Sequence, residues 1–256
     1  MFTASSAFYD LIYSTFKDYA AETAQIVEML RRANPRCRTV LDVACGTGEH
    51  ARRLRAEGFE VDGVDLDPAF VRTASGKNPG GRFVQGEMSN FHLSRQYDAV
   101  LCLFSSIAYL QTMDRVRQAL TCFREHLAPG GVIVVEPWFG PGVLDPQRVT
   151  RNTGEANGVR VSRVTRVEVD GPISRLLFDL EITDATGTRH ASEVHTLGLF
   201  DPADMLRTFE ELGLHADYDP KGLSGRGLYV ALRRLPSPPA ALASGRPRPA
   251  SGTRRS

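Results

Sequence analysis

Apolar positions in the first half of the chain follow two different spacings. Short apolar runs that stop at a glycine or an acid are typical of buried parallel strands. We predict such strands at Thr39–Val43, Glu60–Asp65, Arg82–Gln85, Tyr97–Phe104 and Val132–Glu136. Apolar residues three or four positions apart predict helices instead, at Lys17–Ala33, His50–Glu57, Asp67–Ser75 and Asp114–Leu127. This alternation predicts a Rossmann-like α/β fold, with a parallel sheet covered by helices on both faces.

The pattern changes after Pro137. Three β-rich runs follow, with turn residues and no helix between them, at Gly158–Asp170, Ile173–Asp184 and Arg189–Leu199. They predict an antiparallel β meander inserted after the fifth strand. The chain then returns to a helix and two strands, at Pro202–Leu212, Leu214–Tyr218 and Gly227–Arg233. The short link between these last strands predicts an antiparallel pair that completes a seven-stranded sheet.

These patterns divide the 256 residues into four parts. Residues 1–37 are expected to form an N-terminal lid and helix, and residues 38–139 together with 200–234 the α/β core. Residues 140–199 form the β insertion, which would lie over the substrate site. Residues 235–256 are rich in Pro, Ser, Gly and Ala and carry four arginines and no acid. We therefore predict that this last part is a disordered basic tail.

Composition narrows the function classes. Hydrophobic residues make up 42% of the chain, enough for a sizeable core, and the formal net charge of +1 gives no general attraction to nucleic acid. No run approaches the ~18 apolar residues of a membrane span, and the first residues lack the features of a secretory signal. The four cysteines lack metal-ligand spacing. We expect a cytoplasmic protein with reduced thiols and no metal, nucleic-acid partner or membrane association.

The segment Val40–His50 carries the clearest chemistry. A buried strand runs into a glycine-rich turn at Gly46 and Gly48, and a helix follows. Glycines let the backbone come close to a ligand, which would sit at the carboxyl end of the strand beside the helix N-terminus. Asp65 ends the next strand about 17 residues further on, where a carboxylate can accept hydrogen bonds from both hydroxyls of a ribose.

This glycine turn is compatible with two kinds of cofactor. The pattern Gly46-x-Gly48-x-x-Ala51 matches the fingerprint of dinucleotide-binding proteins. Asp42, inside the end of the strand, favours S-adenosylmethionine instead, because an acid there can attract the α-ammonium group of the methionine part. The segment Gln85–Met88 also offers an acid and an apolar side chain where an adenine would lie. The terminal antiparallel pair of strands points in the same direction.

Several segments together resemble class I S-adenosylmethionine-dependent methyltransferases: LDVACGTGEH, VDLDP, QGEM and LAPGG. Others are similar to the N-methyltransferases that dimethylate TDP-linked 3-amino-deoxysugars in antibiotic pathways: YDLIY, KDYAAE, FSSIAYL, GGVIVVEPWF and SGRGLYVA. The resemblance covers Tyr9–Leu232. It implies S-adenosyl-L-methionine as the cofactor and a nucleotide sugar as the small-molecule substrate, while a homodimer stays open.

Position and resemblance together imply the cofactor site. The methionine end would meet the glycine turn, the strand before it, the lid and the end of the fourth strand, at Asp42, Ala44, Gly46, Gly48, Tyr19 and Phe104. Asp65 would bind the ribose, while Leu66, Glu87 and Met88 would surround the adenine.

The resemblance also implies where the methyl group and its acceptor meet. Tyr13 in the lid would lie near the sulfonium, and His195 or Glu136 could take a proton from the amine. The substrate would contact residues at the ligand edge of the sheet and in the last turn, at Lys17, Ser105, Ser106, Trp138 and Arg226. The guanidinium of this arginine could clamp a phosphate by paired hydrogen bonds.

Three alternatives stay open from the sequence. The chain could methylate the nitrogen or oxygen of another small metabolite through the same cofactor site. It could be an NAD(P)-dependent oxidoreductase that uses the glycine turn for a dinucleotide. It could also be a regulator that binds the cofactor without activity.

Overall fold

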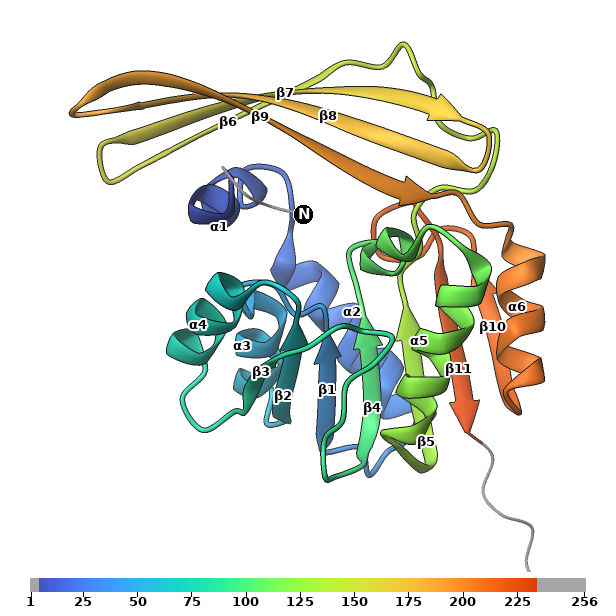
Figure 1. Cartoon of the computed structure of the whole chain (residues 1–256). Helices are drawn as coiled ribbons and strands as arrows, with labels where there is room; N and C mark the ends of the chain where they lie inside the picture. The colour runs from blue at the N-terminus through green and yellow to red at the C-terminus, as the bar shows by residue number, and fades with distance from the viewer. Residues whose placement is uncertain (1–4, 234–256) are drawn as a thin grey trace, which may run out of the picture.

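A computed structural model describes residues 5–233, and the predicted tail at 235–256 lies outside them. Seven strands form the main sheet in the order β10-β11-β5-β4-β1-β2-β3. Their bounds are Thr39–Val43 (β1), Glu60–Asp65 (β2), Phe83–Gln85 (β3), Tyr97–Cys102 (β4), Leu127–Val135 (β5), Leu214–Asp219 (β10) and Leu228–Arg233 (β11). β11 runs antiparallel to β5 and β10, and the other pairs are parallel. The Rossmann-like α/β sheet is confirmed (Figure 1).

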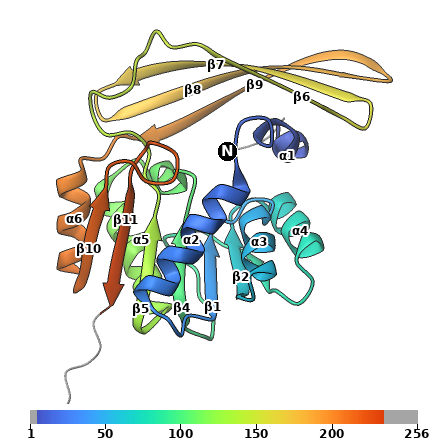
Figure 2. The ribbon, with the colours of Figure 1, turned by 180° about the vertical axis from the view of Figure 1, so that it is seen from behind.

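Helices cover both faces of this sheet (Figures 1 and 2). One face carries Tyr19–Ala33 (α2), Glu49–Ala56 (α3) and Pro68–Lys77 (α4), and the other carries Met113–Glu125 (α5) and Pro202–Glu211 (α6). Each face has its own core, with Leu30 and Leu54 buried on the first and Phe123 and Phe209 on the second. Among the described helices, none is long and apolar enough to cross a membrane.

Several predicted strand ends are shifted, and two of these shifts have a clear physical cause. β5 already begins at Leu127 and passes through Gly130 and Gly131, which we predicted to precede it. The register against β4 shifts at this point, so the extra residues are absorbed by an irregularity in the ladder. β4 ends at Cys102, before the predicted end at Phe104, because Phe104 has a left-handed φ of 53° that a strand cannot continue.

A second sheet of four antiparallel strands stands over the carboxyl edge of the main sheet (Figure 1). We call it the roof sheet. Its strands are Thr150–Ala156 (β6), Val159–Asp170 (β7), Ile173–Asp184 (β8) and Gly187–Gly198 (β9). The inserted meander is confirmed, but β6 was not predicted. Its sequence TRNTGEA is polar and mostly exposed, so it shows none of the apolar alternation that marks a strand.

The N-terminal lid lies between the roof sheet and the main sheet (Figures 1 and 2). It consists of a short 3-10 turn, Ser6–Phe8 (η1), and the helix Tyr9–Tyr13 (α1). Ile12 is buried against Val161 and Leu180 of the roof sheet. The lid is therefore anchored to the roof by apolar contacts.

Glycine lets the lid and the roof sheet approach each other. A Cβ at Gly154 of β6 would lie 2.5 Å from the backbone oxygen of Leu11, so a larger residue would push the strand away.

The helix after the lid begins at Tyr19 instead of Lys17, because the Asp18 carboxylate caps it and accepts the Ala21 N–H at 2.9 Å. The division of the chain into four parts stays a prediction.

Candidate functional site

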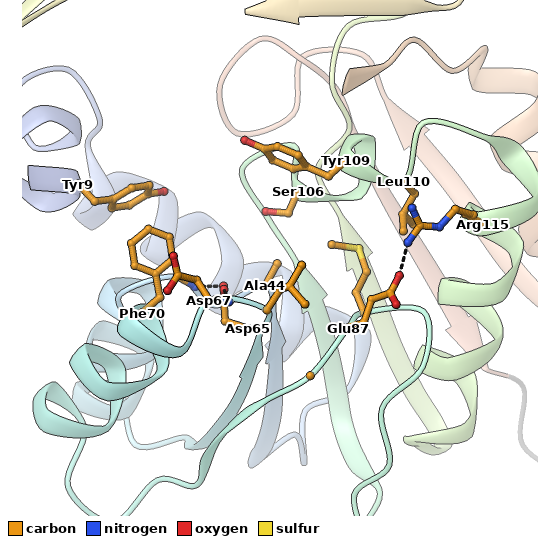
Figure 3. A pocket seen from close by; sticks show the side chains of 14 residues that line it. Tyr9, Ala44, Asp65, Asp67, Phe70, Glu87, Ser106, Tyr109, Leu110 and Arg115 are labelled. Carbon is orange, nitrogen blue, oxygen red and sulfur yellow. Dashed lines mark hydrogen bonds and ion pairs between the residues drawn. The ribbon is translucent and has the colours of Figure 1, made fainter. Parts of the chain in front are cut away.

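The carboxyl edge of the main sheet carries a cavity of about 280 Å³ beneath the lid (Figure 3). Strand ends, the turns after them and the lid line it, through Tyr9, Ala44, Gly46, Asp65, Leu66, Asp67, Phe70, Gly86, Glu87, Met88, Ser106, Tyr109, Leu110 and Arg115. A smaller cavity of about 30 Å³ shares Ala44, Gly46 and Ser106 with the first and continues toward Asp42 and Lys17. The two cavities form one elongated site along this edge of the sheet.

Backbone strain is concentrated at the same edge. Ala44 follows β1 with φ at 57°, and Phe104 and Ser105 follow β4 with φ at 53° and 62°. Residues with a Cβ rarely adopt this left-handed region, and such strain clusters at ligand sites. Here it turns both strand ends sharply beside the smaller cavity.

Gly46 and Gly48 differ in what they do. Gly46 has φ at +55°, and nothing lies within 4 Å of the position that a Cβ would occupy. It lines both cavities, which suits a glycine that a ligand approaches. Gly48 lines neither cavity. It begins α3 with φ at +74°, where a Cβ would lie 2.9 Å from the Ala74 Cβ of α4.

Replacing Gly48 with alanine is expected to lower the free energy of unfolding by about 1–3 kcal/mol, because the new Cβ meets α4 at an unfavourable φ. Chemical denaturation measures the difference. Gly76→Ala is the matched control, since nothing lies within 4 Å of a Cβ at that helical glycine. A Gly48→Ala protein as stable as wild type would show that α3 and α4 can separate freely.

Asp65 lies at the end of β2 and is 9% exposed. Its Oδ2 accepts the Gly46 N–H at 2.7 Å, and its Oδ1 accepts the Asp67 N–H at 2.9 Å. Burial raises the pKa of this carboxyl. The two backbone donors fix its orientation toward the larger cavity, where its remaining lone pairs can accept ligand hydroxyls.

The far end of the larger cavity suits a flat apolar group. Leu66 lines it with 47% of its surface exposed, which is unusual for a large apolar side chain, and Met88 and Phe70 lie around it. Glu87 is paired with Arg115, as the dashed line in Figure 3 shows. Leu66, Glu87 and Met88, which we predicted to surround an adenine, thus line one cavity together with Arg115, and their contact with the adenine stays a prediction.

Asp42 is the most unusual group at the smaller cavity. It is 2% exposed, and its Oδ2 has no hydrogen-bond partner among the described residues. Burial, helped by the charge of Asp65, raises its pKa to about 7. An unpartnered buried carboxyl is expensive to keep, so the position is suited to a cationic group of a ligand.

Lys17, which we predicted to contact the substrate, lines the same small cavity, and its contact with a substrate stays a prediction. Its ammonium pairs with Glu22 at 2.5 Å and stands 4.0 Å over the Phe104 ring. His50 bonds the same carboxylate at 3.0 Å. Burial lowers the pKa of Lys17, although Glu22 opposes the shift. Tyr19 also lines this cavity, as predicted for the methionine end.

Tyr13 is 7% exposed and lines neither cavity. Its ring meets Phe104 edge-on at 5.1 Å, and the Arg163 guanidinium stands 4.9 Å over its face. The lid tyrosine that faces the larger cavity is Tyr9, whose ring points into the gap in Figure 3. A contact between Tyr13 and a sulfonium stays a prediction.

Glu136 is fully buried, and its carboxylate is already engaged. It accepts the Phe104 N–H at 2.7 Å and the Ser224 hydroxyl, and it lies 3.6 Å from the Arg226 guanidinium. Arg226 also donates to Ser105 at 3.2 Å. Glu136 therefore anchors this arginine, which sits inside a polar cluster and not on the surface. A role as proton acceptor stays a prediction that its surroundings do not favour.

Trp138 belongs to the junction between the main sheet and the roof. Its indole N–H donates to the Ser174 hydroxyl of β8 at 3.0 Å, and Arg226 lies 5.7 Å over its ring. Ser106 lines both cavities, while the Ser105 hydroxyl donates to the Pro137 oxygen at 2.7 Å. Of the predicted substrate residues, Lys17 and Ser106 line the described cavities.

His195 is 0% exposed and lies behind the cavity wall. Its Nδ1 is 2.7 Å from the Tyr109 hydroxyl, and its Nε2 is 3.1 Å from the Glu193 carboxylate. Tyr109 lines the larger cavity from the 3-10 turn Ser106–Leu110 (η2). The roof sheet thus reaches the cavity through Tyr109, which the sequence did not single out.

Comparison with known proteins decides what this site belongs to. A family model described as a methyltransferase domain matches residues 40–131. Over 88% of this chain, the sequence is 37% identical to dTDP-3-amino-3,4,6-trideoxy-alpha-D-glucopyranose N,N-dimethyltransferase of Streptomyces venezuelae, of which 95% is covered. It is 34% identical, over the same share, to dTDP-4-amino-2,3,4,6-tetradeoxy-D-glucose N,N-dimethyltransferase of Saccharopolyspora spinosa, of which 91% is covered. The chain belongs to this family of S-adenosylmethionine-dependent methyltransferases.

Solved structures agree with this membership. The methyltransferase superposes on the crystal structure of Streptomyces venezuelae DesVI with a TM-score of 0.85 and 36% identity, covering 93% of this chain and 100% of that one. The structure of S-adenosylmethionine-bound CalS10, an amino pentose methyltransferase from Micromonospora echinaspora, gives 0.80 and 35%, covering 91% and 98%. The cofactor of the enzyme is S-adenosylmethionine, which excludes the alternative of a dinucleotide-dependent oxidoreductase.

The residues of the methyltransferase fit this cofactor. The unpartnered Asp42 carboxyl is suited to an ammonium group, and the open space at Gly46 admits a ligand against the backbone. Asp65 and the exposed Leu66 side chain offer the acceptor and the apolar surface that a nucleoside needs. The assignment of individual residues to parts of the cofactor stays a prediction.

Seven residues that line the larger cavity were not among the predicted site residues: Tyr9, Asp67, Phe70, Gly86, Tyr109, Leu110 and Arg115. A signal existed for Tyr9 and Tyr109, because both lie in the segments YDLIY and FSSIAYL that carried the resemblance. No local signal marked Phe70 or Arg115, since each reaches the cavity from a helix whose facing direction depends on tertiary packing.

Proposed function

We propose that this enzyme transfers methyl groups from S-adenosylmethionine to the amine of a TDP-linked amino deoxysugar. The observation that carries the proposal is the sequence identity to sugar N,N-dimethyltransferases, at 37% and 34% over 88% of the chain. The roof sheet supports it, because an insertion above the carboxyl edge is where a substrate pocket forms in such folds.

The chemistry that the chain must perform is mainly positioning. Bound S-adenosylmethionine supplies an electrophilic methyl group on a sulfonium. Asp42 would hold an ammonium group at the smaller cavity, and Asp65 would hold a pair of hydroxyls at the larger one. The lid and the roof sheet would exclude water and hold the acceptor amine in line with the methyl carbon, about 3 Å away. Alignment of this kind needs no large charge stabilisation, because the positive charge moves from sulfur to nitrogen.

Arg226 is proposed to bind a phosphate group of the nucleotide sugar. Its side chain is 14% exposed and its charge is balanced by the fully buried Glu136, so it is held rigidly at the junction of roof and main sheet. Hydrogen bonds from a fixed guanidinium to a phosphate are among the strong ones. Trp138 lies beside it and would add an apolar wall.

Replacing Arg226 with alanine is expected to raise the Michaelis constant for the nucleotide sugar by roughly 10–100-fold with little change in kcat, because a phosphate clamp binds ground state and transition state alike. Steady-state kinetics measures both. Arg151→Ala is the control, since Arg151 is an exposed arginine of β6. An unchanged Michaelis constant would remove Arg226 from the substrate site.

A methyl-transfer assay against a panel of TDP-amino sugars tests the proposed function, with mass detection of one or two added methyl groups. The proposal predicts turnover of at least one 3-amino or 4-amino deoxysugar. If free amino acids or hydroxylated metabolites are methylated and no sugar is, the enzyme is a small-molecule methyltransferase of another substrate. If the protein binds the cofactor and methylates nothing, it is a regulator.

Two further expectations accompany the proposal. The enzyme is proposed to work in the cytoplasm. Its oligomeric state, for which a homodimer stays open, is measured by light scattering of the purified full-length chain.

A further inference from the structure

A chain of three polar side chains runs from the roof sheet to the larger cavity. The Tyr109 hydroxyl lies 2.7 Å from His195 Nδ1, and His195 Nε2 lies 3.1 Å from Glu193 Oε2. Figure 3 shows the hydroxyl end of Tyr109 pointing across the cavity toward Tyr9. Tyr109 is therefore the member of the chain that a bound substrate can touch.

The two inner members are sealed from water. His195 is 0% exposed and Glu193 is 5% exposed. Glu193 also accepts the backbone N–H of Ser5 and, at 3.0 Å, its hydroxyl. The carboxylate is thus satisfied by several donors, which a buried charge requires. The same bonds tie the start of the lid to the inner end of the polar chain.

His195 is not among the residues that line the larger cavity. The Phe178 ring lies 4.6 Å from it, and Tyr109 occupies its Nδ1. An amine in the larger cavity would meet the phenol first. We therefore expect the proton-accepting role predicted for His195 to be exerted through Tyr109.

We propose that Tyr109 is a catalytic residue that contacts the acceptor amine and takes up its proton, with His195 and Glu193 as positioning residues that receive the Tyr109 proton in turn. This inference rests on the proposed function, because it takes an amine as the acceptor.

The proton transfer balances as follows. An acceptor that arrives as an ammonium ion loses one N–H bond, and the proton forms a new O–H bond at Tyr109 Oη. The original Tyr109 proton passes at the same time to His195 Nδ1, and the resulting imidazolium is paired with the Glu193 carboxylate. The freed nitrogen lone pair then forms the N–C bond to the methyl carbon, while the C–S bonding pair stays on sulfur. The stored proton returns to water by the reverse path after the product leaves.

Electrostatics explains why the phenol must act in concert with a base. Burial raises the pKa of Tyr109, and the facing groups Tyr13, Glu193 and Asp65 raise it further, while Arg163 opposes them. The phenol is therefore neutral at ordinary pH. A neutral hydroxyl can accept a proton from the amine only if it gives its own proton to a partner, and the imidazole is in position to receive it.

Kinetics as a function of pH tests the proposal. Tyr109→Phe removes the hydroxyl and keeps the ring. We expect kcat with a TDP-amino sugar to fall by ~10²-fold or more near pH 7, and the loss to shrink toward pH 9.5, where the amine is already neutral in solution. The Michaelis constant for S-adenosylmethionine should not change. His195→Ala should show the same pH-dependent loss, and the double variant should be no slower than the slower single variant.

Tyr97→Phe is the matched control. Tyr97 is another buried tyrosine, whose hydroxyl donates to Asp62 at 2.8 Å at the beginning of β4, at the opposite edge of the sheet. Its loss should leave kcat and its pH profile unchanged. A loss in Tyr109→Phe that is the same at every pH, or that appears in cofactor affinity, would show a structural role only and overturn the proposal.

A second measurement needs no substrate. Nitrogen-15 spectra of labelled histidine, assigned with His195→Ala, should show His195 protonated at Nε2 and a shift of its Nδ1 signal in Tyr109→Phe. An unchanged Nδ1 signal would show that the bond to Tyr109 is absent in solution. If the wild-type enzyme methylates no amino sugar, the proposed function fails and the amine contact with it, whereas the spectra still decide whether the polar chain exists.

Discussion

Replacing Asp65 with alanine is expected to weaken S-adenosylmethionine binding by roughly 10²–10⁴-fold. In the proposed site its carboxylate accepts both ribose hydroxyls, and hydrogen bonds to a charged group are worth about 1.5–3 kcal/mol each. The same carboxylate orients the glycine turn through the Gly46 N–H at 2.7 Å. Its loss should therefore also loosen the backbone against which the cofactor lies.

Isothermal titration calorimetry measures this affinity. Asp62→Ala is the control, because Asp62 lies three residues earlier on the same strand, where it accepts the Arg82 N–H at 2.8 Å away from the cavity. It should bind the cofactor as wild type does even if its melting temperature falls. Equal affinity in Asp65→Ala and wild type would remove Asp65 from the ribose site.

The main sheet could be predicted because its signals are local. β1 and β2 are apolar runs that end at a glycine turn and at an acid, and their bounds agree with the prediction. β6 could not be predicted, since a polar edge strand is stabilised by its partner β7 and not by its own pattern. The irregular segment of β5 between Leu127 and Val132 could not be predicted for a similar reason, because it depends on the register against β4.

The site residues, too, could be predicted only where their signals are local. Asp42, Gly46 and Asp65 lie within or beside one strand–turn–helix motif, so their place at the carboxyl edge followed from the sequence. The surroundings of Lys17 and His195 could not be predicted from the sequence, because they depend on how the lid and the roof sheet dock. The chain from Glu193 to the cavity joins β9 to η2, whose residues are 86 positions apart at His195 and Tyr109. No motif spans such a distance.

Cofactor affinity is expected to rise with pH until about pH 7 and then to level off. Without a ligand, burial raises the pKa of Asp42 to about 7. An ammonium group pairs with the ionised carboxylate only, so below that pH binding must first expel a proton. Affinity should then fall by about tenfold for each pH unit, and one proton should be released on binding near pH 6.

Asp42→Asn separates this effect from other titrations. The amide carries no charge, so binding should be weaker than in wild type at pH 8 and should lose most of its pH dependence between pH 5.5 and 8. Calorimetry in buffers of different ionisation enthalpy counts the released protons. A wild-type affinity that is flat over this range, or an equally steep profile in Asp42→Asn, would contradict the pairing of Asp42 with the ammonium group.

The stability of the unliganded protein is expected to change with pH in the opposite direction, because of the same Asp42 carboxyl. Its pKa in the folded protein is raised above the unfolded value, so the unliganded protein loses stability as pH rises from about 4 to about 7, because ionisation is easier in the unfolded chain. Unliganded Asp42→Asn should lose less stability over that range, as denaturation at pH 5 and pH 8 would show. Saturating cofactor should raise the stability of the wild-type protein at pH 8 far more than that of the variant. The ammonium group of the cofactor supplies the partner that the buried carboxylate lacks. A variant that loses stability with pH as steeply as wild type would show that Asp42 is not the group that titrates.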